Sequence, residues 1–382
     1  MIAQEQAGSP GMTPRQRVVS AISHRQPDRV PFSWGNGFTA EMSARMEDYL
    51  RARGLDWARL RQVTEDVMLV GPAYIGPLPP ERTDVWGIRT KSVGYGGGHY
   101  AEFEFHPLAG ASTPAEVDAY CWPDPDHHEY ETLRERVLAA GAGSRQAIKT
   151  FASNPFEIYS WMTGLEESLV NLLVNPEVVG CALGHITDYF AAKLSRTLDL
   201  SGDLIDIVLL ADDLGSQRGL LMSRETYRSI LQPFHRRLAG IAHGMAPHVK
   251  VMFHSDGAVF DILPDLIDAR IDILEAVQTD ALGMEPAALK RAYGSRMSFH
   301  GGISVQSLLC HRDALTVSGE CRQLVKVFGE GGGYIAAPSH AVQVGTPPEN
   351  VLSMLEAVIG KEDYEAALCA ARIEDTDRIT RE

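Results

Sequence analysis

Eight short apolar runs, most of them separated by helical patterns, are the feature that most limits how this chain can fold. They are "RVPFSWG" (29–35), "EDVMLVG" (65–71), "RQAIKTFAS" (145–153), "LIDIVLLADD" (204–213), "VKVMFHSD" (249–256), "IDILEAVQ" (271–278), "RMSFHGG" (296–302) and "GGYIAAPSH" (332–340). Strands that alternate with helices pair in parallel, and eight of them favour closure into a barrel. We therefore predict an α/β fold, a single-domain (β/α)8 TIM barrel.

Two segments stand outside the regular alternation. "TPRQRVVSAISH" begins with Thr13 as a helix cap and Pro14 in the first turn, and it predicts an N-terminal helical extension after a loose leader at 1–11. Residues 82–115 predict an inserted β-hairpin with "GYGGGH" as its turn. That turn lacks the GxGxxG spacing of a nucleotide loop, so we expect one barrel domain over 12–382.

Composition narrows the class of protein. The chain has 382 residues, 45% of them hydrophobic, and a net charge of −15, which opposes binding to nucleic acid and to anionic membrane surfaces. Its five cysteines include no CxxC pair, as expected in a reducing cytoplasm. No signal core and no apolar run of about 18 residues occurs, which predicts a cytoplasmic protein without a membrane span.

Polar side chains gather where the predicted strands end, which is where barrel enzymes place their active sites. Trp34, Asn36, Asn154, Glu157, Tyr159, Gln217, Gln278 and His300 are candidates for binding a small-molecule substrate, and Asp212, Asp213, Glu275 and His340 are candidates for catalysis. Five other histidines, His24, His185, His243, His248 and His311, lie on predicted helices or loops and are expected to be surface or packing residues.

A His and an Asp two positions apart close the run at 249–256. The period of two in a strand sends His254 and Asp256 to the same side, and His340 follows the last strand of the barrel. Two imidazoles and a carboxylate suit a divalent metal with an open position, zinc first. The alternative is a hydrogen-bonded pair of His254 and Asp256 that caps the strand, with His340 acting alone as an acid or base.

Three further carboxylates belong to this set. On a strand, one of Asp212 and Asp213 must face the barrel interior and the other the helices, so at most one is expected to meet substrate, and either could instead cap the next turn. Glu275 stands inside the apolar "DILEAV", where a buried carboxylate is costly unless it is paired or ligated. It is a candidate fourth ligand or a base with a raised pKa.

The chain also resembles a known superfamily over nearly its whole length after residue 12. The segments are "TPRQRVVSAISHRQPDRVPFSWG", "LIDIVLLADDLGSQRGLLMSRETYRSILQPFHRRL", "HSDGAVFDILPDLIDARIDILEAVQ", "MSFHGGISVQSLL" and "GGGYIAAPSHAVQVGTPPENVLSMLEAV". Together they are similar to the uroporphyrinogen decarboxylase superfamily, which includes corrinoid-linked and coenzyme M methyltransferases. The resemblance implies a TIM barrel and allows a homodimer.

The methyltransferase branch carries zinc on a His-x-Cys motif after the fifth strand and on a Cys after the eighth. His254 matches the His, Asp256 stands in place of the first Cys, and His340 lies near the second. The resemblance therefore implies a Zn²⁺ site in which harder nitrogen and oxygen replace thiolate, and a reaction that moves a methyl group to or from a thiol or a separate corrinoid protein.

Uroporphyrinogen itself fits poorly. The decarboxylases carry an arginine-rich "MRQAGRY" type segment after the first strand, whereas "FSWGNGFTAEM" here has no arginine to bind substrate carboxylates. Two alternatives to methyl transfer stay open: a metal-free decarboxylase of a small aromatic or pyrrolic acid, with His340 as proton donor, and a barrel that has lost catalysis and only binds a partner.

Overall fold

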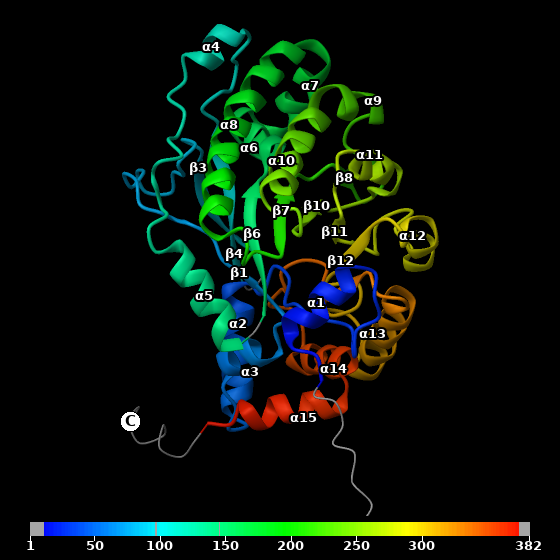
Figure 1. The fold of residues 1–382 in the computed structure, drawn as a ribbon. Helices are drawn as coiled ribbons and strands as arrows, with labels where there is room; N and C mark the ends of the chain where they lie inside the picture. Colours follow the sequence, from blue (N-terminus) through cyan, green and yellow to red (C-terminus); the bar gives the residue numbers. More distant parts are fainter. Residues whose placement is uncertain (1–10, 96–97, 145, 374–382) are drawn as a thin grey trace, which may run out of the picture.

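The computed structural model describes residues 11–95, 98–144 and 146–373, and its centre is a sheet of seven parallel strands that follow one another in chain order (Figure 1). The strands are β1 (Val67–Leu69), β6 (Ala147–Ser153), β7 (Ile207–Ala211), β10 (Lys250–His254), β11 (Ile273–Ala276), β12 (Ser298–Ile303) and β13 (Tyr334–Pro338). Six of them lie inside predicted runs, and β12 extends one residue beyond its run, to Ile303. Strands buried on both faces read as continuous apolar runs, which is why the sequence locates them.

The eighth position of the barrel holds a very short segment rather than a full strand. Phe32 forms an isolated parallel bridge with Ala336 of β13, and the amide of Asp66, just before β1, donates to the carbonyl of Phe32. The segment therefore joins the two edge strands of the sheet. Its pairing is short because the amide of Phe32 donates to the side chain of Asp66 and Pro31 has no amide to donate.

Helix α1 (Pro14–Ile22) covers the amino-terminal end of the barrel. Thr13 caps its start, as the sequence predicts, and it also forms a capping box with Gln16. Val18 and Ile22 pack on an apolar layer inside the barrel. The strand residues of that layer are Val67, Ala147, Ile207, Met252, Ile273 and Ile335. This apolar layer fills much of the amino-terminal end of the barrel.

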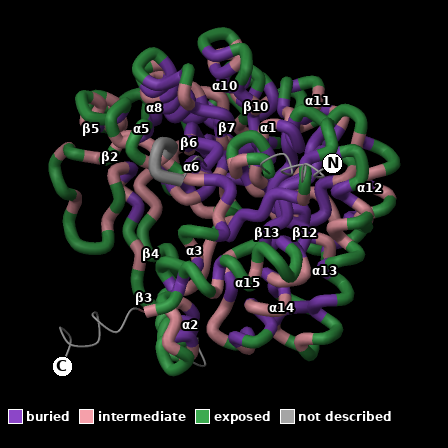
Figure 2. Tube along the Cα trace, turned by 60° about the horizontal axis from the view of Figure 1, so that its bottom comes forward, coloured by how far each residue is buried: buried purple, intermediate pink, exposed green. Residues whose placement is uncertain are grey.

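The remaining helices lie around the sheet, and Figure 2 shows the strands and the inward sides of the helices as the buried part of the chain. They are α2 (Ala40–Arg51), α3 (Trp57–Thr64), α4 (Pro114–Asp118), α5 (Leu133–Ser144), α6 (Pro155–Thr163), α7 (Leu165–Val174), α8 (Pro176–Ser201), α9 (Arg224–Thr226), the π-helix η1 (Tyr227–Leu231), α10 (Gln232–Met245), the 3₁₀ turn η2 (Phe260–Ile262), α11 (Leu263–Asp268), α12 (Pro286–Tyr293), α13 (Ala314–Gly329), α14 (Pro348–Ile359) and α15 (Lys361–Ala370).

A long excursion separates β1 from β6. It contains the antiparallel hairpin of β3 (Arg89–Tyr95) and β4 (Gly98–Phe105), so the predicted insertion is a hairpin, although residues 96–97 of its turn lie outside the described residues. Among the described residues, the remaining four strands are two residues long and form two antiparallel pairs. They are β2 (Ala73–Tyr74) with β5 (His128–Glu129), and β8 (Gly215–Ser216) with β9 (Gly219–Leu220).

Within the described residues, no single helix combines the length and the apolar composition needed to cross a membrane. Helices α7 and α8 meet those criteria only when they are taken together, and the chain bends by 119° between them. Most of the predicted leader, residues 1–10, lies outside the described residues.

Candidate functional site

Three strands place one side chain each in a single row inside the barrel. The register pairs His254 of β10 with Glu275 of β11, and Glu275 with His300 of β12. Nδ1 of His254 lies 3.3 Å from Oε2 of Glu275, and Nδ1 of His300 lies 3.7 Å from Oε1. The sequence therefore identified three residues that the fold brings together.

The charges of this row depend on one another. Burial raises the pKa of an isolated carboxyl, but His254, with Lys149 and His300 nearby, lowers the pKa of Glu275 far below its usual range. Burial lowers the pKa of His254, but Glu275, Asp256 and Asp213 outweigh this effect and raise it to about 9. Burial lowers the pKa of His300 to about 4, so that ring is neutral.

Both ring nitrogens of His300 are buried and have no hydrogen-bond partner among the described residues, and Oε2 of Glu275 has only its ion-pair contact with Nδ1 of His254. Buried polar atoms in proteins are nearly always paired, with protein, water or a ligand. The row therefore offers unused donors and acceptors to whatever occupies the barrel mouth.

Beside this row, Asp213, His254 and Asp256 form a compact group. One ligand atom from each residue lies within 4.8 Å of the others, and Nε2 of His254 is 3.7 Å from Oδ1 of Asp213. Oδ1 of Asp256 is buried without a partner in the described part of the chain, and burial raises the pKa of this carboxyl. Two carboxylates and one imidazole with a free oxygen fit a divalent cation that prefers oxygen and nitrogen ligands.

Two glycines set the separation of the loops that carry this group. Gly257 has φ of +85°, and a Cβ there would lie 2.5 Å from the carbonyl carbon of Gly215. The amide of Asp256 donates to Oδ1 of Asp213 at 2.8 Å. The loops after β7 and β10 therefore touch backbone to backbone, which only glycine permits.

Asp212, next along the chain, points the other way. Its side chain is fully buried; Oδ2 lies 2.6 Å from Nε2 of His235 on α10, and Oδ1 accepts the amide of Glu157. Tyr227 in turn contacts Nδ1 of His235 at 3.1 Å. Of the two aspartates, Asp213 is the one that reaches solvent, with 41% of its side chain exposed.

Glu157 lies at the start of α6, close enough to Asp212 and Asp213 for their negative charges to change its pKa. Burial, with the negative charges of Asp212 and Asp213, raises the pKa of Glu157 to about 8, so this carboxyl keeps its proton at neutral pH. Asn154 donates to it from the preceding turn at 3.2 Å.

The other predicted residues are spread more widely. Trp34 and Tyr159 are packed in the core, where they bond Thr64 and Asn171 respectively. Asn36 and Gln217 are exposed. Gln278 is buried and accepts the amide of Gly257, so it supports the loop after β10. His340 is exposed and lies outside the compact group, although its charge still acts on Asp256.

Sequence reasoning missed three residues near the site. Lys149 on β6 is buried in the barrel and acts electrostatically on Glu275 and His300. It also acts on Glu65, a partly buried acid whose pKa is raised to about 7 by desolvation. His235 is the partner of Asp212. A lysine inside the apolar "AIKTFAS" was a usable signal, whereas His235 on an amphipathic helix gave none.

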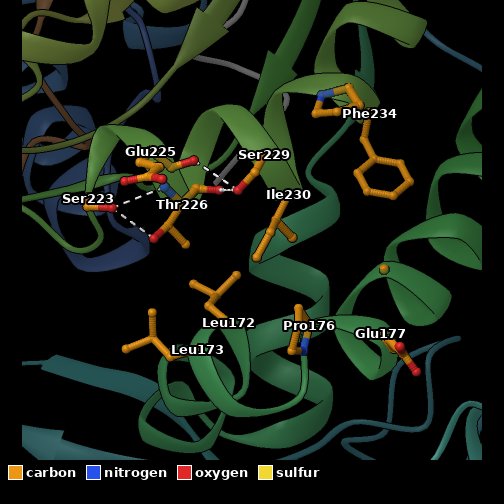
Figure 3. Close-up of a pocket in the computed structure, with 12 residues that line it drawn as sticks. Leu172, Leu173, Pro176, Glu177, Ser223, Glu225, Thr226, Ser229, Ile230 and Phe234 are labelled. Atoms are coloured by element: carbon orange, nitrogen blue, oxygen red, sulfur yellow. Dashed lines mark hydrogen bonds between the residues drawn. The ribbon is translucent and has the colours of Figure 1, made fainter.

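A separate hollow of about 820 Å³ lies on the outside of the barrel, between α7, α8 and the segment from Ser223 to Phe234 (Figure 3). Leu172, Leu173, Pro176 and Ile230 make much of its wall apolar. None of the predicted site residues lines this hollow. The hollow is therefore separate from the candidate site at the barrel mouth.

The sheet of parallel strands, with ionisable groups at the carboxyl ends, makes this chain a TIM-barrel protein. Comparison with known proteins identifies its family. Residues 107–360 match the family described as uroporphyrinogen decarboxylase (URO-D). The chain belongs to this family, whose relatives described below are named as enzymes.

Two curated relatives show the distance within the family. The uroporphyrinogen decarboxylase of Nitrosospira multiformis is 24% identical over 64% of this chain, and that of Methylococcus capsulatus is 24% identical over 66%. The matched region spans 65% and 70% of those relatives. A methyltransferase from Methanosarcina mazei has the same fold, with a TM-score of 0.62 at 18% identity over 91% of this chain and 98% of that one.

Proposed function

We propose that this protein is a metal-dependent methyltransferase or demethylase that acts on a small substrate, with a thiol or a separate corrinoid protein as the methyl acceptor. The observation that carries the proposal is the group of Asp213, His254 and Asp256, with the unpartnered Oδ1 of Asp256. His254 and Asp256 of this group are two of the positions at which the resemblance to corrinoid-linked and coenzyme M methyltransferases implies zinc, and Asp213 takes the place that the resemblance gave to His340. The fold shared with the M. mazei methyltransferase is compatible with this proposal.

Asp213, His254 and Asp256 would hold the metal. Bound there, it would act as a Lewis acid on the oxygen or sulfur that carries the methyl group. Glu275 fixes the ring of His254 from the Nδ1 side, as carboxylates behind metal-binding histidines do. His340 and Asn36 are both exposed and follow neighbouring segments that pair at Phe32 and Ala336, and we propose them as residues that contact substrate.

Methyl transfer breaks the bond between the methyl carbon and its oxygen or sulfur and forms a bond from that carbon to the acceptor. The acceptor, a thiolate or Co(I), supplies the new electron pair, and the old pair stays on the leaving heteroatom, which takes a proton. Glu157 is the candidate donor because it is protonated at neutral pH and lies beside Asp213. Asp212 positions Glu157, because Oδ1 of Asp212 accepts a hydrogen bond from the backbone amide of Glu157.

Decarboxylation of a small aromatic or pyrrolic acid is the second candidate, favoured by the same protonated carboxyl. The bond to the carboxylate carbon would break, its electron pair would stay on the ring carbon, and Glu157 would protonate that carbon as carbon dioxide leaves. The acidic net charge and the absence of arginine in 32–42 argue against a substrate with many carboxylates.

The test supplies the zinc-loaded protein with small methoxy and methylthio compounds and with cob(I)alamin, and it follows methylcobalamin formation by absorbance. We expect formation to require the metal and to disappear in His254→Ala. His311→Ala, at an exposed histidine outside the site, serves as the matched control. Release of carbon dioxide from aromatic acids with no methyl transfer would reject the first function in favour of the second.

A further inference from the structure

A second group of metal-ligating side chains shares no residue with the group at the barrel mouth. It consists of Asp118 at the end of α4 and of Cys181 and His185 on α8, and one ligand atom from each lies within 4.8 Å of the others. Figure 1 shows α4 beside the amino-terminal half of α8, which carries Cys181 and His185. The group is independent of the family site, and neither the sequence patterns nor the comparisons assign it a role.

The geometry of the group is set by secondary structure. Cys181 and His185 are four residues apart on one helix, so their side chains share a face. Sγ of Cys181 lies 3.2 Å from Oδ1 of Asp118, and Nε2 of His185 lies 2.8 Å from the same oxygen. Tetrahedral zinc, with bonds of about 2.0 to 2.3 Å, requires ligand atoms separated by roughly 3.2 to 3.8 Å, so small shifts would admit an ion.

The histidine ring is held in this position. The indole of Trp122 stacks on the ring of His185, with centroids 4.9 Å apart and planes 11° apart. Stacking fixes the ring and directs Nε2 at Asp118. Both His185 and Asp118 remain accessible, with 35% and 62% of their side chains exposed, so a metal ion and a water ligand could reach the site.

We propose that Asp118, Cys181 and His185 bind a zinc ion that fastens the segment around α4 to α8. One thiolate, one imidazole and one carboxylate form a ligand set that zinc accepts, and water would take the fourth position. The ion would join two parts of the chain 63 or more residues apart, so it would stabilise the fold without entering the reaction.

Binding must displace a proton from the thiol. Burial, together with the nearby Asp118, raises the pKa of Cys181 to about 11, so in the metal-free protein the thiol donates to the carboxylate. Zinc binding to the group should therefore release protons and strengthen as the pH rises.

The two metal sites can be told apart with cobalt(II), because only a thiolate ligand gives the intense near-ultraviolet sulfur-to-cobalt band. The barrel group has nitrogen and oxygen ligands alone. The full-length protein, kept reduced with a phosphine, is titrated with cobalt(II) and then with zinc, and its Tm is measured with and without zinc.

We expect the wild-type band, its loss on adding zinc, and a higher Tm with zinc. Cys181→Ser should abolish the band, and His185→Ala should weaken cobalt affinity by about tenfold or more. Cys121→Ser and Cys369→Ser, at exposed cysteines outside the group, should retain it. No band in the wild type, or a band that survives Cys181→Ser, would overturn the proposal and leave the barrel site untouched.

Discussion

Nε2 of His235 lies 2.6 Å from Oδ2 of Asp212, and both side chains are almost completely buried. This pair connects α10 to the end of β7 and anchors the strand end from which Asp213 extends. Since Oδ1 of Asp212 also accepts the amide of Glu157, the pair fixes three parts of the site at once.

Replacing His235 by alanine should cost about 3 to 5 kcal/mol of unfolding free energy, because it leaves a buried carboxylate without its partner. Urea denaturation measures the loss. Arg236→Ala, at the exposed neighbouring position, should change stability by less than about 0.5 kcal/mol. Equal effects of the two substitutions would show that the pair contributes little.

Gly257→Ala should separate the loops after β7 and β10. Its positive φ and the carbonyl carbon of Gly215, 2.5 Å from the added Cβ, leave no room for a side chain. We expect a loss of about 1 to 3 kcal/mol in stability and a clear fall in metal affinity. Calorimetric titration with zinc measures the affinity.

Gly244→Ala is the matched control for that substitution. Gly244 lies in α10, and within the described part of the chain an added Cβ would meet no neighbouring atom within 4 Å, so alanine should stabilise the helix by up to about 1 kcal/mol and leave zinc binding unchanged. A Gly257→Ala protein with normal zinc affinity would contradict the role given to the two loops.

Lys193 on α8 predicts a stability change at alkaline pH. Burial lowers its pKa from 10.5 to about 8, so the unfolded chain binds more protons than the folded one between these values. Stability should therefore rise as the pH increases from about 8 to about 10.5. Lys193→Met should remove this rise and add about 1 to 2 kcal/mol at pH 7, a discounted figure because part of the side chain reaches solvent.

Urea denaturation across this pH range tests the prediction. Lys326→Met, at an exposed lysine on α13, should leave the pH profile of the wild type intact. If Lys193→Met kept the wild-type rise above pH 8, another group would have to cause it.

His340 distinguishes the ligand set predicted from sequence from the set that the structure groups together. The sequence predicts His254, Asp256 and His340, whereas Asp213 completes the compact group of described residues. We expect His340→Ala to retain its metal and to lose turnover, and Asp213→Asn to lose affinity by about tenfold or more. Metal analysis after dialysis against a weak chelator compares the two, and the reverse order would restore His340 as the ligand.

The sequence predicted the barrel well because its strands are buried on both faces and therefore read as separate apolar runs. The prediction overestimated the length of the first strand. Phe32 pairs only briefly because its amide donates to the side chain of Asp66, which lies 34 residues further along the chain. Candidate residues were chosen mainly by their position at strand ends, and the structure places three of them, His254, Glu275 and His300, side by side on adjacent strands, while their roles stay predictions.

Long-range pairing was not predictable in the same way. The orientation of Asp212 toward His235, and the inward position of Lys149, depend on how distant segments pack. Trp34 and Tyr159 also follow predicted strands, but their side chains are buried in the hydrophobic core and do not face the site. A position at a strand end thus indicates proximity to the site, while packing decides which side chain faces it.

The most direct test of the central claim is elemental analysis of the purified chain beside the His254→Ala, Asp256→Ala double variant. Because the second proposed metal group is separate, both proteins carry Cys181→Ser, and circular dichroism confirms that both are folded. We predict about one zinc per chain in the parent and none in the double variant. Equal metal in both proteins, or none in the parent even after incubation with zinc, would contradict a metal centre at the barrel mouth.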